Sequence, residues 1–143
     1  MTTATPPDLS PAQLDAILAY LPIFAQPGFV FGAWHTPEGQ FPFWTASPEV
    51  RAFLNVLHRE QFITPFDWVN WAKEAQRYRT GGDTALATAD LTTLRKLLTA
   101  YVRADRFAEG TLAARFEEGH ITAILRRLQQ IRATSAPAVE DEA

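Results

Sequence analysis

The stretch GFVFGAWHTPEGQFPFWT, residues 28–45, decides the fold class of this 143-residue chain. Phe29–His35 and Phe41–Thr45 are short aromatic runs of the kind that forms strands, and Thr36–Gln40 between them has the proline and glycine of a turn. The pattern predicts a β-hairpin. Pro42 has no N–H for a sheet ladder, so it belongs on an edge strand or at a bulge. A lone hairpin is marginally stable in water, so we expect it to pack against helices.

Three helices are predicted to begin with the same signal, a hydroxyl residue followed by proline. The signal occurs at Ser10-Pro11, at Ser47-Pro48 and at Thr64-Pro65. The hydroxyl residue suits the N-cap position because its oxygen accepts a hydrogen bond from a free backbone N–H, and proline fits the first helical position. Gln13 completes a capping box in the first of these helices, and the negatively charged Asp67 completes one in the third.

Apolar spacing predicts that each helix buries one face, because side chains at positions i, i+3, i+4 and i+7 lie on the same side. Asp90 is predicted to cap a fourth such helix, and Pro22 to end or kink the first. Gly81-Gly82 is expected to end the third helix, and Gly119 a shorter helix around Leu112–Phe116. The predicted inward-facing residues are Leu14, Ile17, Leu18 and Leu21; Val50, Phe53, Leu54 and Leu57; Trp68, Trp71, Ala72, Ala75 and Tyr78; Leu91, Leu94, Leu98, Tyr101 and Val102; and Ile121, Ile124, Leu125, Leu128 and Ile131.

These elements predict one α+β domain that is mainly α, with five to six helices and one N-terminal β-hairpin packed on the helical core. Residues 10–132 form the single globular domain in this prediction, after a short N-terminal extension over residues 1–9. Residues 133–143 are small and acidic and include a proline, which is typical of a disordered tail.

Composition excludes several classes of function. Without cysteine the chain has no disulfide, no thiol nucleophile and no cysteine-based metal centre. His35, His58 and His120 show no metal-ligand spacing and no glycine-rich phosphate loop is present, so no metal and no cofactor is expected. Met1–Pro7 has no signal-peptide pattern, and no apolar run approaches the roughly 18 residues of a membrane span. We therefore expect a cytoplasmic protein without membrane contact.

Charge is divided unevenly along the chain, whose formal net charge is −3. Residues 73–132 contain 11 Lys and Arg against 7 Asp and Glu, an excess of +4 in an otherwise acidic protein. Nucleic-acid binding usually requires a denser basic stripe, so nucleic acid is not an expected partner. The modest basic excess favours an anionic small molecule or an acidic protein surface instead.

The most unusual stretch of the basic half is VRADRFAEG, residues 102–110. Arg103 and Arg106 are three residues apart, so on a helix their guanidinium groups lie on one side. Together with Lys96, one heptad before Arg103, they form a candidate ligand-binding site for a phosphate or a carboxylate.

Two carboxylates, Asp105 and Glu109, accompany these arginines. In the anion-site hypothesis they orient the guanidinium groups toward the ligand. In the alternative they tie up the arginines in an internal salt-bridge cluster that holds a helix junction, which is the commoner use of such clusters.

A pair of tryptophans lies upstream, in the predicted third helix. Trp68 and Trp71 are three residues apart, so they share a face. Such a pair is either part of the core, which is the commoner use of tryptophan, or an aromatic shelf that stacks against a sugar, a base or a nicotinamide ring. Glu117 and Glu118, by contrast, point about 100° apart on a helix and cannot share a proton.

Many of these residues together resemble one bacterial family. The residues that carry the resemblance are Pro65-Phe66-Asp67-Trp68, Trp71, Tyr78, Leu94, Val102-Arg103, Asp105-Arg106-Phe107, Glu109-Gly110, Leu112, Gly119, Ile121, Ile124-Leu125 and Arg127-Leu128. The family is DUF6508, a family of unknown function, and the resemblance spans Leu14 to Ile131. Because the family has no established activity, the resemblance implies no catalytic residue, ligand or cofactor. Members sometimes lie beside ADP-ribose-processing macro domains, which implies an ADP-ribose-like ligand as one option.

Two functions from different classes remain open. The first is a non-enzymatic binding or interaction module that presents its basic face to an anionic ligand or an acidic partner. The alternative is a small hydrolase or transferase acting on a phosphorylated or ADP-ribose-like substrate, in which Arg103 and Arg106 orient the substrate and Asp67 or Asp105 acts as base. The first is favoured because the sequence contains no recognisable combination of nucleophile and base.

Overall fold

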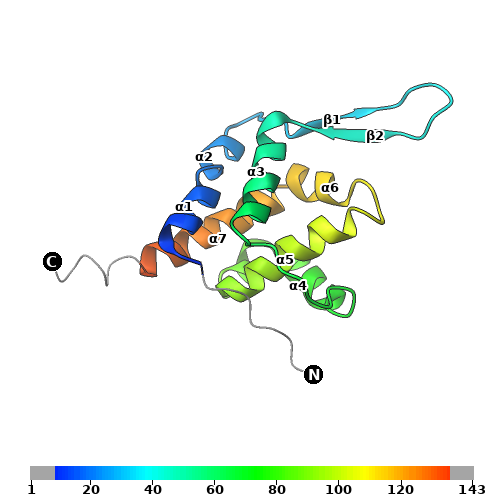
Figure 1. Ribbon diagram of the computed structural model, residues 1–143. Coiled ribbons are helices and arrows are strands. Elements are labelled where there is room, and N and C mark those ends of the chain that lie inside the picture. Colours follow the sequence, from blue (N-terminus) through cyan, green and yellow to red (C-terminus); the bar gives the residue numbers. More distant parts are fainter. Residues whose placement is uncertain (1–8, 136–143) are drawn as a thin grey trace.

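The structure is a computed structural model that describes residues 9–135. The chain forms α1 (Pro11–Leu18), α2 (Leu21–Phe24), β1 (Gly32–His35), β2 (Phe43–Ala46), α3 (Pro48–Arg59), α4 (Ala72–Leu86), α5 (Leu91–Ala104), α6 (Thr111–Glu117) and α7 (His120–Ser135) (Figure 1). Since α2 is a single turn, the described residues contain six longer helices and one antiparallel hairpin. The predicted class, mainly α with an N-terminal hairpin, is confirmed.

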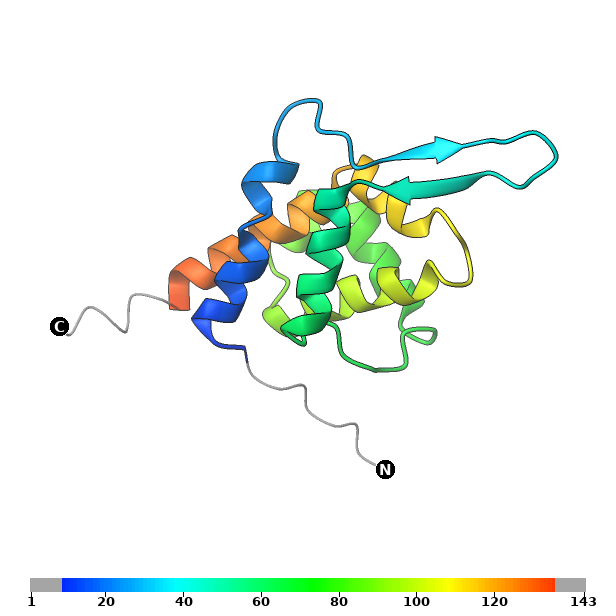
Figure 2. The same ribbon diagram turned by 45° about the horizontal axis from the view of Figure 1, so that its top comes forward.

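The core is built around α7, which contacts α1, α2, α4, α5 and α6. Figures 1 and 2 show α7 crossing the helical body, with α1 and α2 on one side and α4 and α5 on the other. A helix with a continuous apolar face must be covered along that face, which explains why so many elements meet on it. Its predicted inward face is indeed covered: Ile121, Ile124, Leu125 and Leu128 are fully buried, and Ile131 is half-buried.

A cluster of phenylalanines joins the N-terminal half of the chain to the helices. Phe24 of α2 meets Phe53 of α3 and Phe116 of α6 edge to face, with ring centroids 5.2 and 5.5 Å from that of Phe24. Phe29 and Phe31, which precede β1, pack against the same ring. Edge-to-face packing suits the quadrupoles of aromatic rings, and their burial contributes strongly to the core. The cluster therefore attaches the approach to the hairpin to the helical body.

Three of the predicted helix starts are confirmed. Ser10 Oγ accepts from the Gln13 N–H at 3.2 Å, and Gln13 Oε1 accepts from the Ser10 N–H at 2.8 Å, which completes the capping box. Ser47 and Asp90 each accept a hydrogen bond from the backbone N–H three residues further on, at the starts of α3 and α5. Pro22 lies in the first turn of α2, after α1 has ended.

The predicted start of the third helix is wrong. α4 begins only at Ala72, and the backbone is irregular from Thr64 up to that point. Thr64 does not act as a cap, and its N–H donates instead to Thr99 Oγ1 of α5 at 3.2 Å. Asp67 accepts from the backbone and side-chain N–H groups of Asn70, at 3.3 and 2.6 Å.

A buried arginine of α5 explains this departure. Arg95 is 5% exposed and donates through Nε to the Phe62 carbonyl at 3.2 Å and through Nη2 to the Gln61 carbonyl at 2.6 Å. Thr99, one turn later, is fully buried and donates to the Arg95 carbonyl while it accepts from the Thr64 N–H. Because buried polar groups are costly unless they are hydrogen-bonded, these contacts with α5 outweigh the local capping signal.

Glycines end or bend two helices. Gly82 adopts φ 60° and ψ −145°, which glycine reaches without steric strain, so α4 is kinked there. The regular helix therefore ends at the predicted glycine pair, Gly81-Gly82, and a further helical turn beyond the kink runs to Leu86, whose burial favours this turn. Gly119, with φ 86°, follows the end of α6 as predicted.

The boundaries of the domain lie slightly outside the predicted ones. α7 continues to Ser135, so residues 133–135, which composition assigns to the tail, are helical. Leu9, which the prediction assigns to the N-terminal extension, packs against the core. The rest of the predicted tail and of the predicted extension lies outside the described residues.

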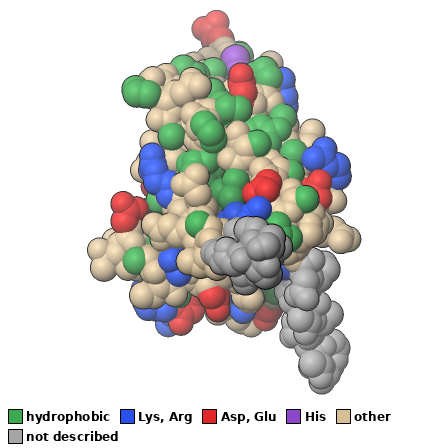
Figure 3. Space-filling model, turned by 90° about the vertical axis from the view of Figure 1, so that its left-hand side faces the viewer, with side chains coloured by type: hydrophobic (Ala, Val, Ile, Leu, Met, Phe, Trp, Pro, Cys, Tyr) green, Lys and Arg blue, Asp and Glu red, His purple; other side chains and the backbone are tan. Residues whose placement is uncertain are grey.

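The hairpin pairs Gly32 with Ala46 and His35 with Phe43 in antiparallel register. Pro42 precedes β2 and so stands outside the ladder. β2 contacts α3 at the base of the hairpin, whereas the turn projects from the helical body (Figures 1 and 2). On the face that carries α1 and α2, hydrophobic side chains gather over the upper half, toward the hairpin (Figure 3).

Candidate functional site

A buried tyrosine and a buried histidine face each other between α5 and α7. Tyr101 Oη and His120 Nε2 lie 2.8 Å apart and share a hydrogen bond, and each residue is 6% exposed. Burial lowers the pKa of His120 to about 4, and the charges of Arg115 and Arg79 act in the same direction. Burial also raises the pKa of Tyr101. Both groups are therefore uncharged at physiological pH.

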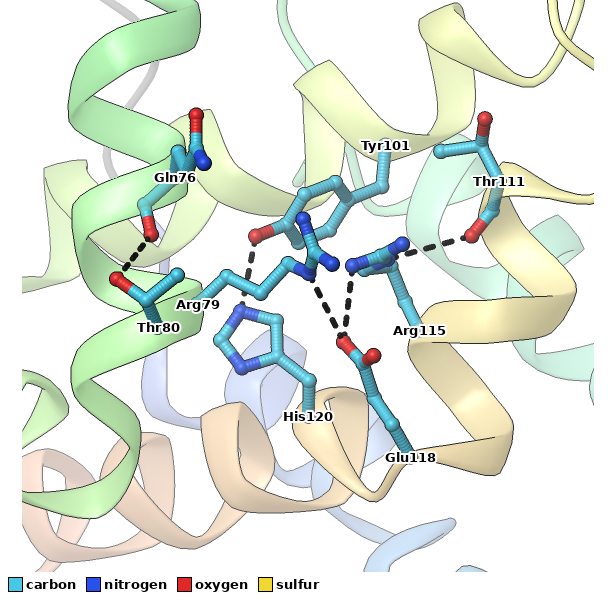
Figure 4. Close-up of polar contacts among 8 residues, drawn as sticks. All are labelled: Gln76, Arg79, Thr80, Tyr101, Thr111, Arg115, Glu118 and His120. Carbon is cyan, nitrogen blue, oxygen red and sulfur yellow. Dashed lines mark hydrogen bonds and ion pairs between the residues drawn. The ribbon is translucent and has the colours of Figure 1, made fainter.

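Two arginines from neighbouring helices converge beside this pair (Figure 4). Arg115 Nη1 of α6 lies 2.9 Å from Glu118 Oε2, and Arg79 Nε of α4 lies 3.6 Å from the same oxygen. Arg115 also donates through Nε to the Thr111 carbonyl at 3.4 Å, and its guanidinium lies 5.8 Å from the centre of the Tyr101 ring. Two positive charges thus share one carboxylate oxygen.

Arg79 has fewer hydrogen-bond partners than Arg115. Its side chain is 43% exposed, whereas that of Arg115 is 11% exposed. Among the residues that the structure describes, Glu118 is its only ionic partner, at a distance too long for a direct hydrogen bond. The guanidinium of Arg79 therefore keeps N–H donors that can bind an incoming anion.

Two clefts lie beside these residues, and Arg79 lines both. The smaller has a volume of about 230 Å³ and lies between α4, α5 and α6. The larger, of about 350 Å³, is lined by Asp83, Glu118 and His120 among others. Because Tyr101 lines the smaller cleft and His120 the larger, their hydrogen bond connects the two. We call the smaller one the alanine-walled cleft, after its lining residues Trp68, Ala72, Ala75, Ala100, Tyr101 and Ala104.

The arginines predicted from the sequence lie elsewhere. Arg103 is half-buried in the last turn of α5, and Arg106 is exposed in the loop that follows. Within residues 9–135, neither guanidinium forms a hydrogen bond or an ion pair. Both guanidinium groups can therefore bind a ligand from solution. Lys96 does not lie with them, because it lines a separate cleft with Phe66 and Trp71.

Asp105 and Glu109 bind backbone groups rather than the arginines. Asp105 Oδ1 accepts from the N–H groups of Gly110 and Leu112, at 3.2 and 3.0 Å, and so closes the turn onto the start of α6. Glu109 Oε2 accepts from the Trp44 N–H of β2 at 3.3 Å. The expectation that these carboxylates tie up or orient the arginines is therefore corrected, because they satisfy free N–H groups of a helix start and a strand edge.

Lys96 and the two tryptophans are also separated. Lys96 Nζ lies 5.6 Å from the ring centre of Phe66 and 5.7 Å from that of Trp71, in a third cleft of about 330 Å³. Trp68 lines the alanine-walled cleft and stacks on the exposed ring of Phe107, with ring centroids 6.1 Å apart. Because α4 begins after both tryptophans, they do not share a helical face, and they line different clefts.

Sequence reasoning missed the residues that the structure gathers around Tyr101. Arg115 and Glu118 are three residues apart, which is a signal for a local ion pair. No local pattern connects His120 with Tyr101 or brings Arg79 to Glu118, because these residues belong to different helices. Within residues 9–135, no group of His, Asp and Glu is arranged to hold a metal ion.

These observations define a small helical domain with a projecting hairpin and a cleft that carries two arginines. The chain belongs to DUF6508, a family of unknown function, whose model matches residues 9–134. The resemblance seen in the sequence is thereby confirmed. No curated protein and no solved structure matches the chain. Of the helices described, none combines the length and the apolar character that crossing a membrane requires.

Proposed function

We propose that this protein is a non-enzymatic binding module for a small anionic molecule with a flat apolar part, held in the alanine-walled cleft. The observation that carries the proposal is that Arg79 and Arg115 share a single carboxylate oxygen of Glu118 beside this cleft. A carboxylate or phosphate on a ligand brings the second negative charge, and the free donors of Arg79 can bind it through two parallel hydrogen bonds.

The walls of the alanine-walled cleft suit a ligand whose apolar part is a flat ring. Ala72, Ala100 and Ala104 take up little room between the helices, while Trp68 and Tyr101 add aromatic surface. Aromatic walls favour planar partners, because flat rings pack against them with a large contact area. An inorganic anion alone leaves this apolar wall in contact with water, so we expect it to bind more weakly than an aromatic acid.

An enzymatic role has less support. A general base must reach the substrate and be free to turn toward the proton that it takes. Two arginines share Glu118 Oε2, two N–H groups at the start of α6 share Asp105 Oδ1, and Asp67 binds Asn70, so the protein already holds each of these carboxylates in place. The acid–base groups that remain beside the two clefts are Asp83 and the Tyr101–His120 pair. If they act in catalysis, the protein is expected to convert the bound ligand chemically.

A thermal-shift titration of the full chain tests the proposal. The probes are benzoate, phenyl phosphate, inorganic phosphate, AMP and ADP-ribose. The aromatic or nucleotide anions are expected to raise Tm, since a ligand at a concentration of 100 times its Kd adds about 2.7 kcal/mol to the free energy of unfolding. Arg79→Gln is expected to abolish the shift. Arg77→Gln is the matched control, because Arg77 is an exposed arginine of the same helix that pairs with Glu74.

Two further variants locate the site. Ala104→Leu fills the alanine-walled cleft without changing charge, so it is expected to remove the shift as well. Arg106→Gln alters the arginine predicted from the sequence and is expected to leave the shift intact. Loss of the shift in Arg106→Gln but not in Arg79→Gln would move the site to Arg103 and Arg106. An unchanged Tm with every probe contradicts the proposal, and conversion of a probe by the protein favours the enzyme.

A further inference from the structure

The backbone groups of the hairpin alternate in direction along its ladder. In an antiparallel pair, opposite residues alternate between those that exchange hydrogen bonds and those whose N–H and C=O groups point outward. Trp34 lies opposite Trp44, and the Trp44 N–H points outward, because it donates to a carboxylate of the α5–α6 turn. The Ser47 N–H donates to the Phe31 carbonyl at 2.8 Å, which agrees with this alternation. The outward residues of β1 are therefore Gly32 and Trp34.

The two outer edges of the hairpin differ in whether side chains of the protein bind their backbone groups. On β2, Glu109 Oε2 accepts from the Trp44 N–H at 3.3 Å, and Arg51 Nη1 donates to the Ala46 carbonyl at 2.9 Å. β2 is the strand nearer the helices, and β1 is the outer strand in both views (Figures 1 and 2). The outward groups of β1 have no hydrogen-bond partner in the described part of the chain. One edge is thus closed by the molecule's own side chains, and the other is open.

The open edge lacks the features that usually prevent strand pairing. Its sequence, Gly-Ala-Trp-His, has no proline, no lysine and no carboxylate. The hairpin and its flank also hold four of the six exposed large hydrophobic side chains among the described residues: Val30, Trp34, Phe41 and Phe43. Unpaired N–H and C=O groups next to exposed apolar side chains form a template for a further strand.

We propose that β1 pairs with β1 of a second copy of this chain, antiparallel across a two-fold axis, to form a four-stranded sheet. Pairing through the outward groups sets Gly32 opposite the second copy's Trp34, and the reverse. Ala33 then faces its own copy at the axis. This inference does not depend on the ligand site proposed above.

Charge identifies a second copy as the occupant of this edge. A two-fold interface joins the same surface of both copies, so a strand edge that carries charge meets like charge and an uncharged edge does not. β1 has no lysine, arginine or carboxylate, and it therefore suits its own copy rather than a charged peptide. Pairing also turns a two-stranded hairpin, which is marginally stable by itself, into a more stable four-stranded sheet.

A charge exchange at Ala33 tests the pairing and its register. Ala33 is exposed, so a longer side chain there leaves the hairpin intact. Sedimentation equilibrium of the wild-type chain is expected to show a dimer as concentration rises. Ala33→Lys and Ala33→Glu each set like charges together at the axis, which is expected to raise the dimer Kd at least about tenfold. An equal mixture of the two variants is expected to associate as tightly as the wild type, because opposite charges then meet.

Thr45→Lys is the matched control. Thr45 lies opposite Ala33 in the ladder and is also exposed, but it belongs to the covered strand. Its equivalent in the dimer is three strand spacings away, about 14 Å, which exceeds the Debye length of about 8 Å. This variant is expected to dimerise like the wild type, with unchanged circular dichroism in all variants. A wild type that stays monomeric at every concentration overturns the proposal, and so does an Ala33→Lys variant that associates like the wild type.

Discussion

Tyr101 Oη lies 2.8 Å from His120 Nε2, and the two residues are buried together beside the charged side chains of Arg79, Arg115 and Glu118. Removal from water disfavours the charged form of each group, which raises the pKa of Tyr101 and lowers that of His120. The two arginines add to the effect on His120, because a positive imidazolium next to positive guanidinium groups is repelled.

Acidification is expected to destabilise the protein through His120. The pKa of His120 is about 4 in the folded protein, against about 6.5 for an unperturbed histidine, so the unfolded chain binds the proton more tightly. The contribution of neutral His120 to the free energy of unfolding is therefore fully present above pH 6.5. As the pH falls from 6.5 toward 4, the free energy of unfolding is expected to fall by about 3 kcal/mol. Urea unfolding of the wild type and of His120→Gln at several pH values measures it. Equal pH dependence of the free energy of unfolding in both proteins would contradict the prediction, because His120 is the only titratable group in which they differ.

Replacing Asp105 is expected to destabilise the protein, whereas replacing the neighbouring Arg106 is not. Asp105→Ala leaves the N–H groups of Gly110 and Leu112 without an acceptor, which is expected to cost about 1–2 kcal/mol. Arg106→Ala removes an exposed side chain without a described partner, so its effect is expected to stay within about 0.5 kcal/mol. Chemical unfolding of both variants measures the contrast. A large loss of stability in Arg106→Ala would restore the salt-bridge alternative.

Gly110→Ala is expected to destabilise the protein for two reasons. Gly110 has φ 101°, and a Cβ there would approach the Trp34 ring to 3.1 Å. The expected cost is about 1–3 kcal/mol, from backbone strain together with displacement of the ring. Gly39→Ala is the control, because Gly39 also has a positive φ but nothing near its Cβ position. Thermal unfolding compares the two variants, and an equal loss in both would show that the Trp34 contact contributes nothing.

Thr99 is expected to be more important than Thr64. Thr99→Val keeps the shape of a fully buried side chain but leaves the Thr64 N–H without an acceptor, at an expected cost of about 1–3 kcal/mol. Thr64→Ala keeps that N–H and removes a hydroxyl that caps no helix, so it is expected to be nearly neutral. Urea unfolding of the two variants measures the order. The reverse order would support the helix start predicted from the sequence.

The sequence by itself determined the elements whose partners are close along the chain. The caps at Ser10, Ser47 and Asp90 bond N–H groups three residues away, and the turn between the strands needs only local backbone preferences. Such contacts form with little loss of chain entropy, so a short stretch of sequence contains most of the information needed to predict them.

Only the tertiary structure decided the contacts between distant parts of the chain. Thr64 has the local pattern of a cap, yet its N–H bonds Thr99, 35 residues later, because the buried polar groups of α5 need partners. Glu109 bonds the backbone of Trp44, 65 residues earlier, rather than a neighbouring arginine. The cleft depends in the same way on how α4 to α7 pack, since packing alone brings the charges of separate helices to one carboxylate. Charge spacing along one helix shows which side chains share a face, but burial on the folded protein decides which of them meet.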